Sequence, residues 1–160
     1  MESARNFYEN LPPPAECLAI LVGCAQLTVF GLGGLANPIS WARTYGLPIV
    51  PASRLQRQQS PTEQTLAAEE AEKTQIALIS ALTARNVRHG VVIVAAACYL
   101  RDRRAIAIAL IANGISALSD ALIVNWFGDA EQTVGHATGL AGSLALGGFL
   151  LRWRRDDPWW

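Results

Sequence analysis

The first hydrophobic stretch of the chain reads CLAILVGCAQLTVFGLGGLANPISWA, from Cys17 to Ala42, and contains no charged side chain. A helix needs about 20 predominantly apolar residues to cross roughly 30 Å of hydrocarbon. Because this stretch exceeds that length, it predicts a membrane-spanning helix over about residues 17–40. The residues before it are acidic and rich in proline, which does not fit a cleaved signal peptide, so we expect the helix to remain as an anchor.

Two later stretches predict membrane helices over about residues 105–127 and 132–152. The first of these contains Asp120 as its only charged residue, and the second is free of charge from Gln132 to Leu151. Both are long enough to span a bilayer.

A weaker candidate helix covers residues 75–100 and contains three basic side chains, Arg85, Arg88 and His89. We count it as a crossing because the arginine-rich turn that follows, residues 101–104, belongs at a membrane surface, and a helical hairpin is the simplest way to hold it there. The sequence therefore predicts an all-α fold, an integral membrane four-helix bundle that forms a single membrane domain over residues 1–160.

The connection over residues 43–74 is polar and contains three prolines. Within it, Ser60, Pro61, Thr62 and Glu63 form a capping box with proline at the first helical position. We expect an amphipathic helix to begin there and to continue into the second hydrophobic stretch.

Basic residues favour one side of this topology, and the positive-inside rule then places both termini in the cytoplasm. Tryptophans near the helix ends, among them Trp126, are expected to anchor the bundle at the interfaces. The face that holds the termini carries Arg5, Arg101, Arg103, Arg104, Arg152, Arg154 and Arg155, against Arg43, Arg54, Arg57 and Lys73 on the opposite face.

Composition excludes several classes of function. The 13 basic and 13 acidic residues give no net charge and no basic patch, so we expect no nucleic-acid partner. Cys17, Cys24 and Cys98 lie in apolar runs without metal-ligand spacing, and no nucleophile-elbow or HExxH motif is present. We therefore expect no cofactor and no metal, and any catalysis would use acid–base or electrostatic effects.

Ionisable side chains at membrane depth are costly, and they usually face a partner inside the bundle. With a rise of about 1.5 Å per residue, Arg85, Asp120 and His136 all lie toward the same, non-cytoplasmic half of the predicted helices. This agreement predicts an ion pair between Arg85 and Asp120 with His136 close to it. The alternative is that this network only holds the helices in register, as polar pairs often do in membranes.

Helical spacing extends this candidate site. Asn113, Ser116 and Asp120 form a polar stripe on the third helix, and Arg85, Arg88 and His89 do the same on the second. On the last helix small residues recur at every fourth position, which allows another backbone to approach closely. We expect this stripe of Gly135, Gly139, Ser143 and Gly147 to serve packing within the bundle, with homodimerisation as the alternative.

Several short motifs resemble a family of small four-helix membrane proteins that is known only as a domain of unknown function, found in fungi and bacteria. The resemblance covers the chain from about Leu18 onward, and one departure is Asn86, where an acidic residue often stands. The motif residues are Asn37, Pro38, Ala42, Arg43, Tyr45, Gly46, Leu47, Pro48, Ala84, Arg85, Asn86, Asp120 and Gly128.

Relatives of this kind often lie in fungal natural-product gene clusters, so the resemblance implies an accessory cyclase or isomerase in secondary-metabolite biosynthesis, in the endoplasmic reticulum membrane. A hydrophobic small molecule would enter an apolar cavity from the lipid bilayer. Asp120 or His136 would move a proton while Arg85 stabilises negative charge, so these three are the candidate catalytic residues. The candidate substrate-binding residues are Arg88, Asn86, Asn113 and Ser116.

Two functions without catalysis stay open at this point. A membrane scaffold or assembly factor would use the ion pair structurally and recruit pathway enzymes through the long loop. A small-molecule carrier would change where a product accumulates and leave its total amount unchanged.

Overall fold

A computed structural model describes residues 12–51 and 63–152 of the 160-residue chain, and within these ranges the regular structure is entirely helical. Two short segments, η1 and η3, have the wider π-helical winding. The elements, in chain order, are α2 (Pro14–Ala25), η1 (Gln26–Leu32), α3 (Gly33–Ala36), α4 (Pro38–Tyr45), α6 (Glu63–Val94), η3 (Ala95–Leu100), α7 (Arg103–Phe127), η4 (Ala130–Gln132) and α8 (Thr133–Arg152).

Three helices of the described part are long and apolar enough to cross a membrane: Pro14–Ala36, Arg103–Phe127 and Ala130–Arg152. Their apolar side chains point largely outward, because only 22%, 44% and 17% of the respective hydrophobic windows are buried. A water-soluble bundle would bury this surface, whereas hydrocarbon solvates it. These helices indicate a membrane protein.

The predicted second crossing does not meet the same criterion. Residues 75–100 belong to one long helix, α6 continued by η3, whose first turns are strongly charged, and this helix is not among the three candidate spans. The described part of this helix begins at Glu63, whereas the predicted cap at Ser60 and first helical position at Pro61 lie outside the described residues.

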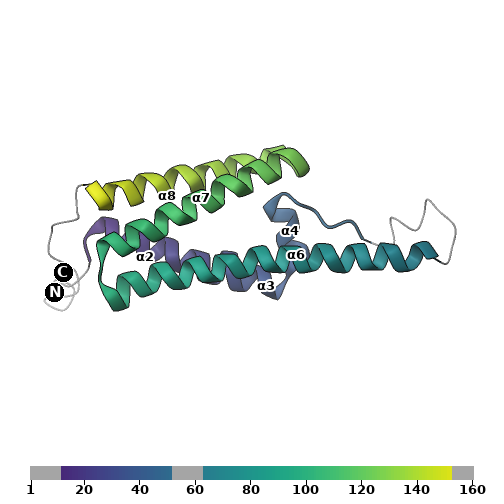
Figure 1. Ribbon diagram of the computed structural model, residues 1–160, viewed down its shortest axis with the longest axis horizontal. Coiled ribbons are helices and arrows are strands. Elements are labelled where there is room, and N and C mark those ends of the chain that lie inside the picture. The colour runs from purple at the N-terminus through teal and green to yellow at the C-terminus, as the bar shows by residue number, and fades with distance from the viewer. Residues whose placement is uncertain (1–11, 52–62, 153–160) are drawn as a thin grey trace, which may run out of the picture.

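The helices form two antiparallel pairs that lie side by side (Figure 1). In one pair α7 packs along α8, and in the other α2, η1 and α3 run along α6. The start of α2, the turn between η3 and α7, and the end of α8 lie at one end of the molecule. The first turns of α6 project beyond the opposite end of the bundle, past the turn between α7 and α8.

Glycines bring the first helix very close to α6. A Cβ atom added to Gly31 would lie 2.6 Å from Val87 Cγ2 and 2.9 Å from the Val87 backbone nitrogen. An added Cβ on Gly90 would collide with the backbone of Leu27. These glycines therefore allow the two backbones to pack in direct contact.

An apolar core fills the half of the bundle nearest the Arg101 turn. Ile93, Ile106, Leu110 and Leu150 are fully buried there and belong to one cluster with alanines of α2, α7 and η3. Toward the other end α7 also buries polar side chains, Asn113 and Asp120, beside apolar Ala121 and Val124.

Helix α4 folds back and is fixed to the turn between α7 and α8. It ends at Gly46, whose left-handed φ of 93° glycine adopts without strain, and the Gly46 carbonyl accepts a hydrogen bond from the Asp129 backbone at 2.8 Å. Gly128 lies so close that an added Cβ would overlap the Gly46 carbonyl oxygen. Gly46 and Gly128, which are both motif residues and lie 82 positions apart in the sequence, are thus in close contact.

A buried ion pair that the sequence did not predict connects α2 to the beginning of α7. The Arg103 guanidinium contacts the Glu16 carboxylate, and both side chains are almost completely buried. Glu16 precedes the first predicted helix and Arg103 belongs to the predicted interfacial turn. The hydrophobic pattern alone therefore does not predict this pair.

Candidate functional site

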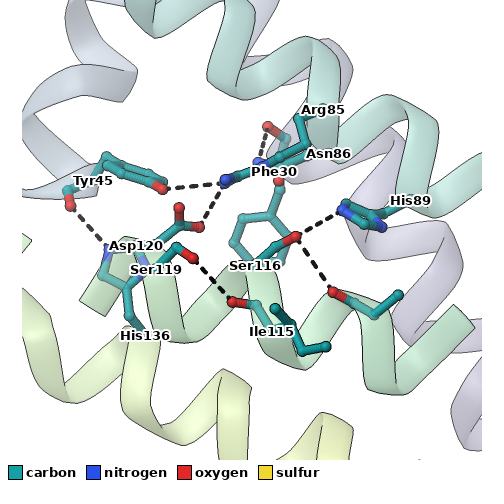
Figure 2. Close-up of polar contacts among 11 residues, drawn as sticks. Phe30, Tyr45, Arg85, Asn86, His89, Ile115, Ser116, Ser119, Asp120 and His136 are labelled. Atoms are coloured by element: carbon teal, nitrogen blue, oxygen red, sulfur yellow. Dashed lines mark hydrogen bonds and ion pairs between the residues drawn. The ribbon is translucent and has the colours of Figure 1, made fainter. Parts of the chain in front are cut away.

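The predicted ion pair between Arg85 and Asp120 is present in the structure. An Arg85 Nη2 donates to Asp120 Oδ2 at 2.6 Å, joining α6 to α7 across the bundle (Figure 2). Asp120 is only 6% exposed, so its charge would be costly without this partner. Arg85 is partly exposed and does not line the cavity described below, so it binds the carboxylate from outside the cavity.

Tyr45 completes this group from the end of α4. Its hydroxyl accepts a weak hydrogen bond from Arg85 at 3.4 Å, and the residue is buried. Burial, and next the negative charge of Asp120, raise the pKa of the Tyr45 phenol above its ordinary value. The phenol therefore stays neutral at physiological pH and can donate its proton in a hydrogen bond.

His136 projects from α8 toward the same group. Its Nε2 lies 3.1 Å from the Tyr45 carbonyl oxygen, and its ring packs edge-on against the Tyr45 ring with centroids 4.6 Å apart. Since a carbonyl oxygen only accepts, this hydrogen bond requires the proton on Nε2. Nδ1 of the neutral ring is then unprotonated and is able to accept a proton.

Asp120, Tyr45 and His136 line a cavity of about 320 Å³, within the usual size range of small-molecule sites. Its walls come from η1, α4, α6, α7 and α8, so it lies between the two helix pairs. The lining residues are Gln26, Phe30, Trp41, Thr44, Tyr45, Asn86, Asn113, Ser116, Ala117, Asp120, Gln132, Gly135, His136 and Gly139.

Three of the predicted substrate-binding residues, Asn86, Asn113 and Ser116, line this cavity. Each also has a structural hydrogen bond. Asn86 donates to the Phe30 carbonyl at 3.3 Å, Asn113 donates to Ser143 at 3.0 Å, and Ser116 pairs with His89 at 3.0 Å. The side chains are thereby held in place at the cavity wall.

Arg88, the fourth predicted substrate-binding residue, is exposed and does not line the cavity. Helical rotation of about 100° per residue explains why the basic stripe of Arg85, Arg88 and His89 divides into a buried and an exposed part. Arg88 lies about 60° to one side of Arg85, whereas His89 lies about 40° to the other side, where α7 packs. His89 is accordingly buried and Arg88 is not.

The small-residue stripe of α8 also divides. Ser143 and Gly147 pack against α7, and an added Cβ on Gly147 would lie 2.9 Å from the Ala107 carbonyl oxygen. Gly135 and Gly139 have no atom within 4 Å of an added Cβ, and both line the cavity. The expected packing role therefore holds for only one half of the stripe.

Several polar atoms of the cavity walls have no hydrogen-bond partner among the described residues. They are Oδ1 of Asp120, Nε1 of Trp41 and Oε1 of Gln26, all buried. Buried polar groups in proteins are nearly always satisfied, so such a cluster indicates a place for a polar ligand or water. No group of three His, Cys, Asp or Glu side chains that would suit a metal is found in residues 12–51 and 63–152.

The sequence interpretation did not include Gln26, Trp41 or Tyr45 in the site. Trp41 and Tyr45 lie beyond the first predicted helix, and only the fold-back of α4 at Asn37 and Pro38 brings them inside. The pair Asn-Pro is a usable signal, because Asn37 caps α4 by accepting from the Ser40 backbone and proline occupies the first helical position.

A second hollow, about 840 Å³ and more open, is lined by residues 47–50, by α6 and by the end of α7. Its walls are mainly aliphatic and aromatic, including Leu78, Leu82, Ile123 and Phe127, and Asp129 is its only ionisable lining residue. The groups suited to proton transfer therefore gather in the smaller cavity.

These features define a small helical membrane protein with a buried ionic group beside a cavity between its helices. A family model described as a domain of unknown function, DUF4267, matches residues 24–150, and the chain belongs to this family. The matched region includes every residue that lines the smaller cavity. No curated protein and no solved structure matches the chain.

Proposed function

We propose that this protein is an acid–base enzyme of the membrane, a cyclase or isomerase that acts on a hydrophobic intermediate of fungal secondary-metabolite biosynthesis. The observation that carries the catalytic part is the state of Asp120. This carboxylate is ion-paired through Oδ2, while its buried Oδ1 has no partner among the described residues, and it lines a cavity of ligand size. The pathway context rests on the family resemblance.

The proposed chemistry moves one proton within the substrate. Arg85 holds the Asp120 carboxylate through Oδ2, and Oδ1 accepts a proton from one carbon of the substrate and returns it at another position, with no net change in atoms. The neutral Tyr45 phenol donates a hydrogen bond to negative charge that develops on the substrate. His136, with Nδ1 unprotonated, is the second candidate base.

The topology belongs to the same proposal. The chain crosses the endoplasmic reticulum membrane four times, with α6 and η3 forming the crossing after α4, and both termini are cytoplasmic. Support comes from the antiparallel alignment of α6 and η3 with the first helix, and from the shared end of α2, the Arg101 turn and α8 (Figure 1).

The deciding experiment compares Asp120→Asn with Glu16→Gln in a host that expresses the surrounding pathway, with product and membrane abundance measured together. Each substitution removes the negative charge of a buried ion pair between helices, but Glu16 does not line the cavity. We expect Asp120→Asn to lower product formation by about 10²–10⁴-fold at normal abundance, the typical contribution of a general base. Glu16→Gln should keep the yield per molecule of protein.

The single variant leaves Arg85 without its counter-ion, which can lower abundance for structural reasons. The double variant Arg85→Gln with Asp120→Asn removes both charges and keeps amide groups in their place. If the single variant loses abundance while the double variant is abundant and still forms the product, the ion pair is structural and a membrane scaffold replaces the enzyme as the function. If total product is unchanged but moves between cells and medium, the protein is a carrier.

A further inference from the structure

We infer that the cavity opens sideways into the hydrocarbon of the bilayer, through a window between η1 and α8 whose width is set by Gly135 and Gly139. The ligand is accordingly a lipid-soluble molecule that places its polar group at Asp120 and its apolar body against Phe30, Trp41 and the glycines. This inference rests on the proposed function for the identity of the site, and it specifies the substrate class and its route.

The first argument is the missing side of the cavity wall. Gly135 and Gly139 are exposed, they line the cavity, and an added Cβ at either position would meet no atom within 4 Å. Helix α8 packs mainly on α7, so the side of α8 that carries these glycines is not covered by another helix. Phe30, on the facing η1 segment, is 41% exposed.

The second argument is depth. Gly139 lies about 9 Å along α8 from Thr133, and Phe30 lies about 9 Å along the first helix from Ala36, at a rise of 1.5 Å per residue. Both edges of the window therefore lie within their spanning helices, at similar distances from the same end of the bundle. At this depth the open side faces lipid tails.

The third argument points to a ligand independently of the glycines. Asp120 is 94% buried and lines the same cavity, and its Oδ1 has no hydrogen-bond partner among the described residues. Trp41 Nε1 and Gln26 Oε1 share this condition. A molecule with an apolar body and at least one hydroxyl or carbonyl group would satisfy these atoms, whereas a pure hydrocarbon would leave them unpaired.

Trp41 offers a direct test that requires no substrate. In a chain with Trp126, Trp153, Trp159 and Trp160 replaced by Phe, tryptophan fluorescence reports on the cavity alone. The full-length protein is reconstituted in phosphatidylcholine vesicles with or without bromine on the acyl chains, and iodide is the quencher in water. We expect brominated lipid to quench Trp41 and iodide to have little effect.

Gly139→Leu is expected to abolish most of this quenching, because an added Cβ there meets no atom within 4 Å and the rest of the leucine side chain would occupy the window. Gly142→Leu is the matched control, since Gly142 is equally open but does not line the cavity, and it should retain the quenching. If Gly139→Leu does not fold, Gly135→Leu serves the same purpose.

Quenching by iodide in place of brominated lipid would overturn the inference, and so would equal quenching in the Gly139→Leu and parent proteins. Asp120→Asn should leave the quenching unchanged. A protein that shows the window but forms no product would refute the proposed chemistry alone, so the two proposals fail in different measurements.

Discussion

The two carboxylate oxygens of Asp120 have different surroundings. Arg85 binds Oδ2, while the buried Oδ1 has no hydrogen-bond partner among the described residues, and Asp120 lines the cavity. A carboxylate that served only to hold the helices together would gain stability by using both oxygens, because unsatisfied buried acceptors are costly. The free oxygen is the feature that a substrate would use.

His136 allows structure and chemistry to be separated by one substitution. In His136→Gln the amide nitrogen replaces Nε2 as the donor to the Tyr45 carbonyl, but the basic Nδ1 is lost. We expect abundance and melting temperature to stay near those of the parent while product formation falls, measured with the same product assay. Full activity in this variant would remove His136 from the proposed mechanism and leave Asp120 as the base.

The residues of the site were predictable to different degrees. Arg85, Asp120 and His136 could be grouped because charged side chains at equal membrane depth need partners. Arg88 does not line the cavity, and the sequence could not show this, because spacing defines a helix face but does not say which edge of that face meets the neighbouring helix. Trp41 and Tyr45 were missed because their position depends on the fold-back of α4, which is a tertiary event.

At the level of elements, the close contact between the first helix and α6 depends on glycines in both. Gly31→Ala or Gly90→Ala would push the helices apart, and we expect each to cost about 1–3 kcal/mol, as overpacking usually does. Thermal unfolding in detergent, followed by circular dichroism, measures the effect. Gly148→Ala is the control, because its added Cβ meets no neighbouring atom.

The control should be neutral or gain up to about 1 kcal/mol, since alanine has the higher helix propensity. If Gly31→Ala and Gly90→Ala were as stable as Gly148→Ala, the two helices could not approach as closely as described.

The η1 segment that carries Gly31 is π-helical, and segments of this kind often lie at functional sites. Gln26 and Phe30 of η1 line the cavity.

The length of each hydrophobic stretch predicts the position of a helix more reliably than it predicts the number of membrane crossings. Runs without charge predict α7 and α8 closely, because few other structures can hold 20 apolar residues. The second crossing was ambiguous because α6 and η3 combine a charged beginning, basic residues in the middle and an apolar end. Such a helix fits a crossing only if its polar residues face the bundle, which hydropathy does not report.

For the whole molecule, the four crossings that we propose would place the two ends of α6 and η3 on opposite sides of the membrane. Single cysteines at Glu69, Arg104 and Glu131, in a chain without its native cysteines, can be labelled with an impermeant maleimide in sealed microsomes. We expect Arg104→Cys to react from the cytoplasmic side, and Glu69→Cys and Glu131→Cys to react only after permeabilisation. Labelling of Glu69→Cys and Arg104→Cys from the same side would limit the chain to three crossings. Labelling of Glu69→Cys from the cytoplasmic side and of Arg104→Cys only after permeabilisation would reverse the orientation.

The ion pair between Glu16 and Arg103 also bears on how the chain is assembled during synthesis. Its partners are 87 positions apart, so a nascent chain that has exposed the first helix to the translocon does not yet contain Arg103. A carboxylate is costly to bury without that cation, so the Glu16 end of the first helix should pack into the bundle only after α7 arrives. The third long helix thereby completes the packing of the first, and ribosome-bound chains that end before Arg103 should hold the first helix less firmly than longer ones.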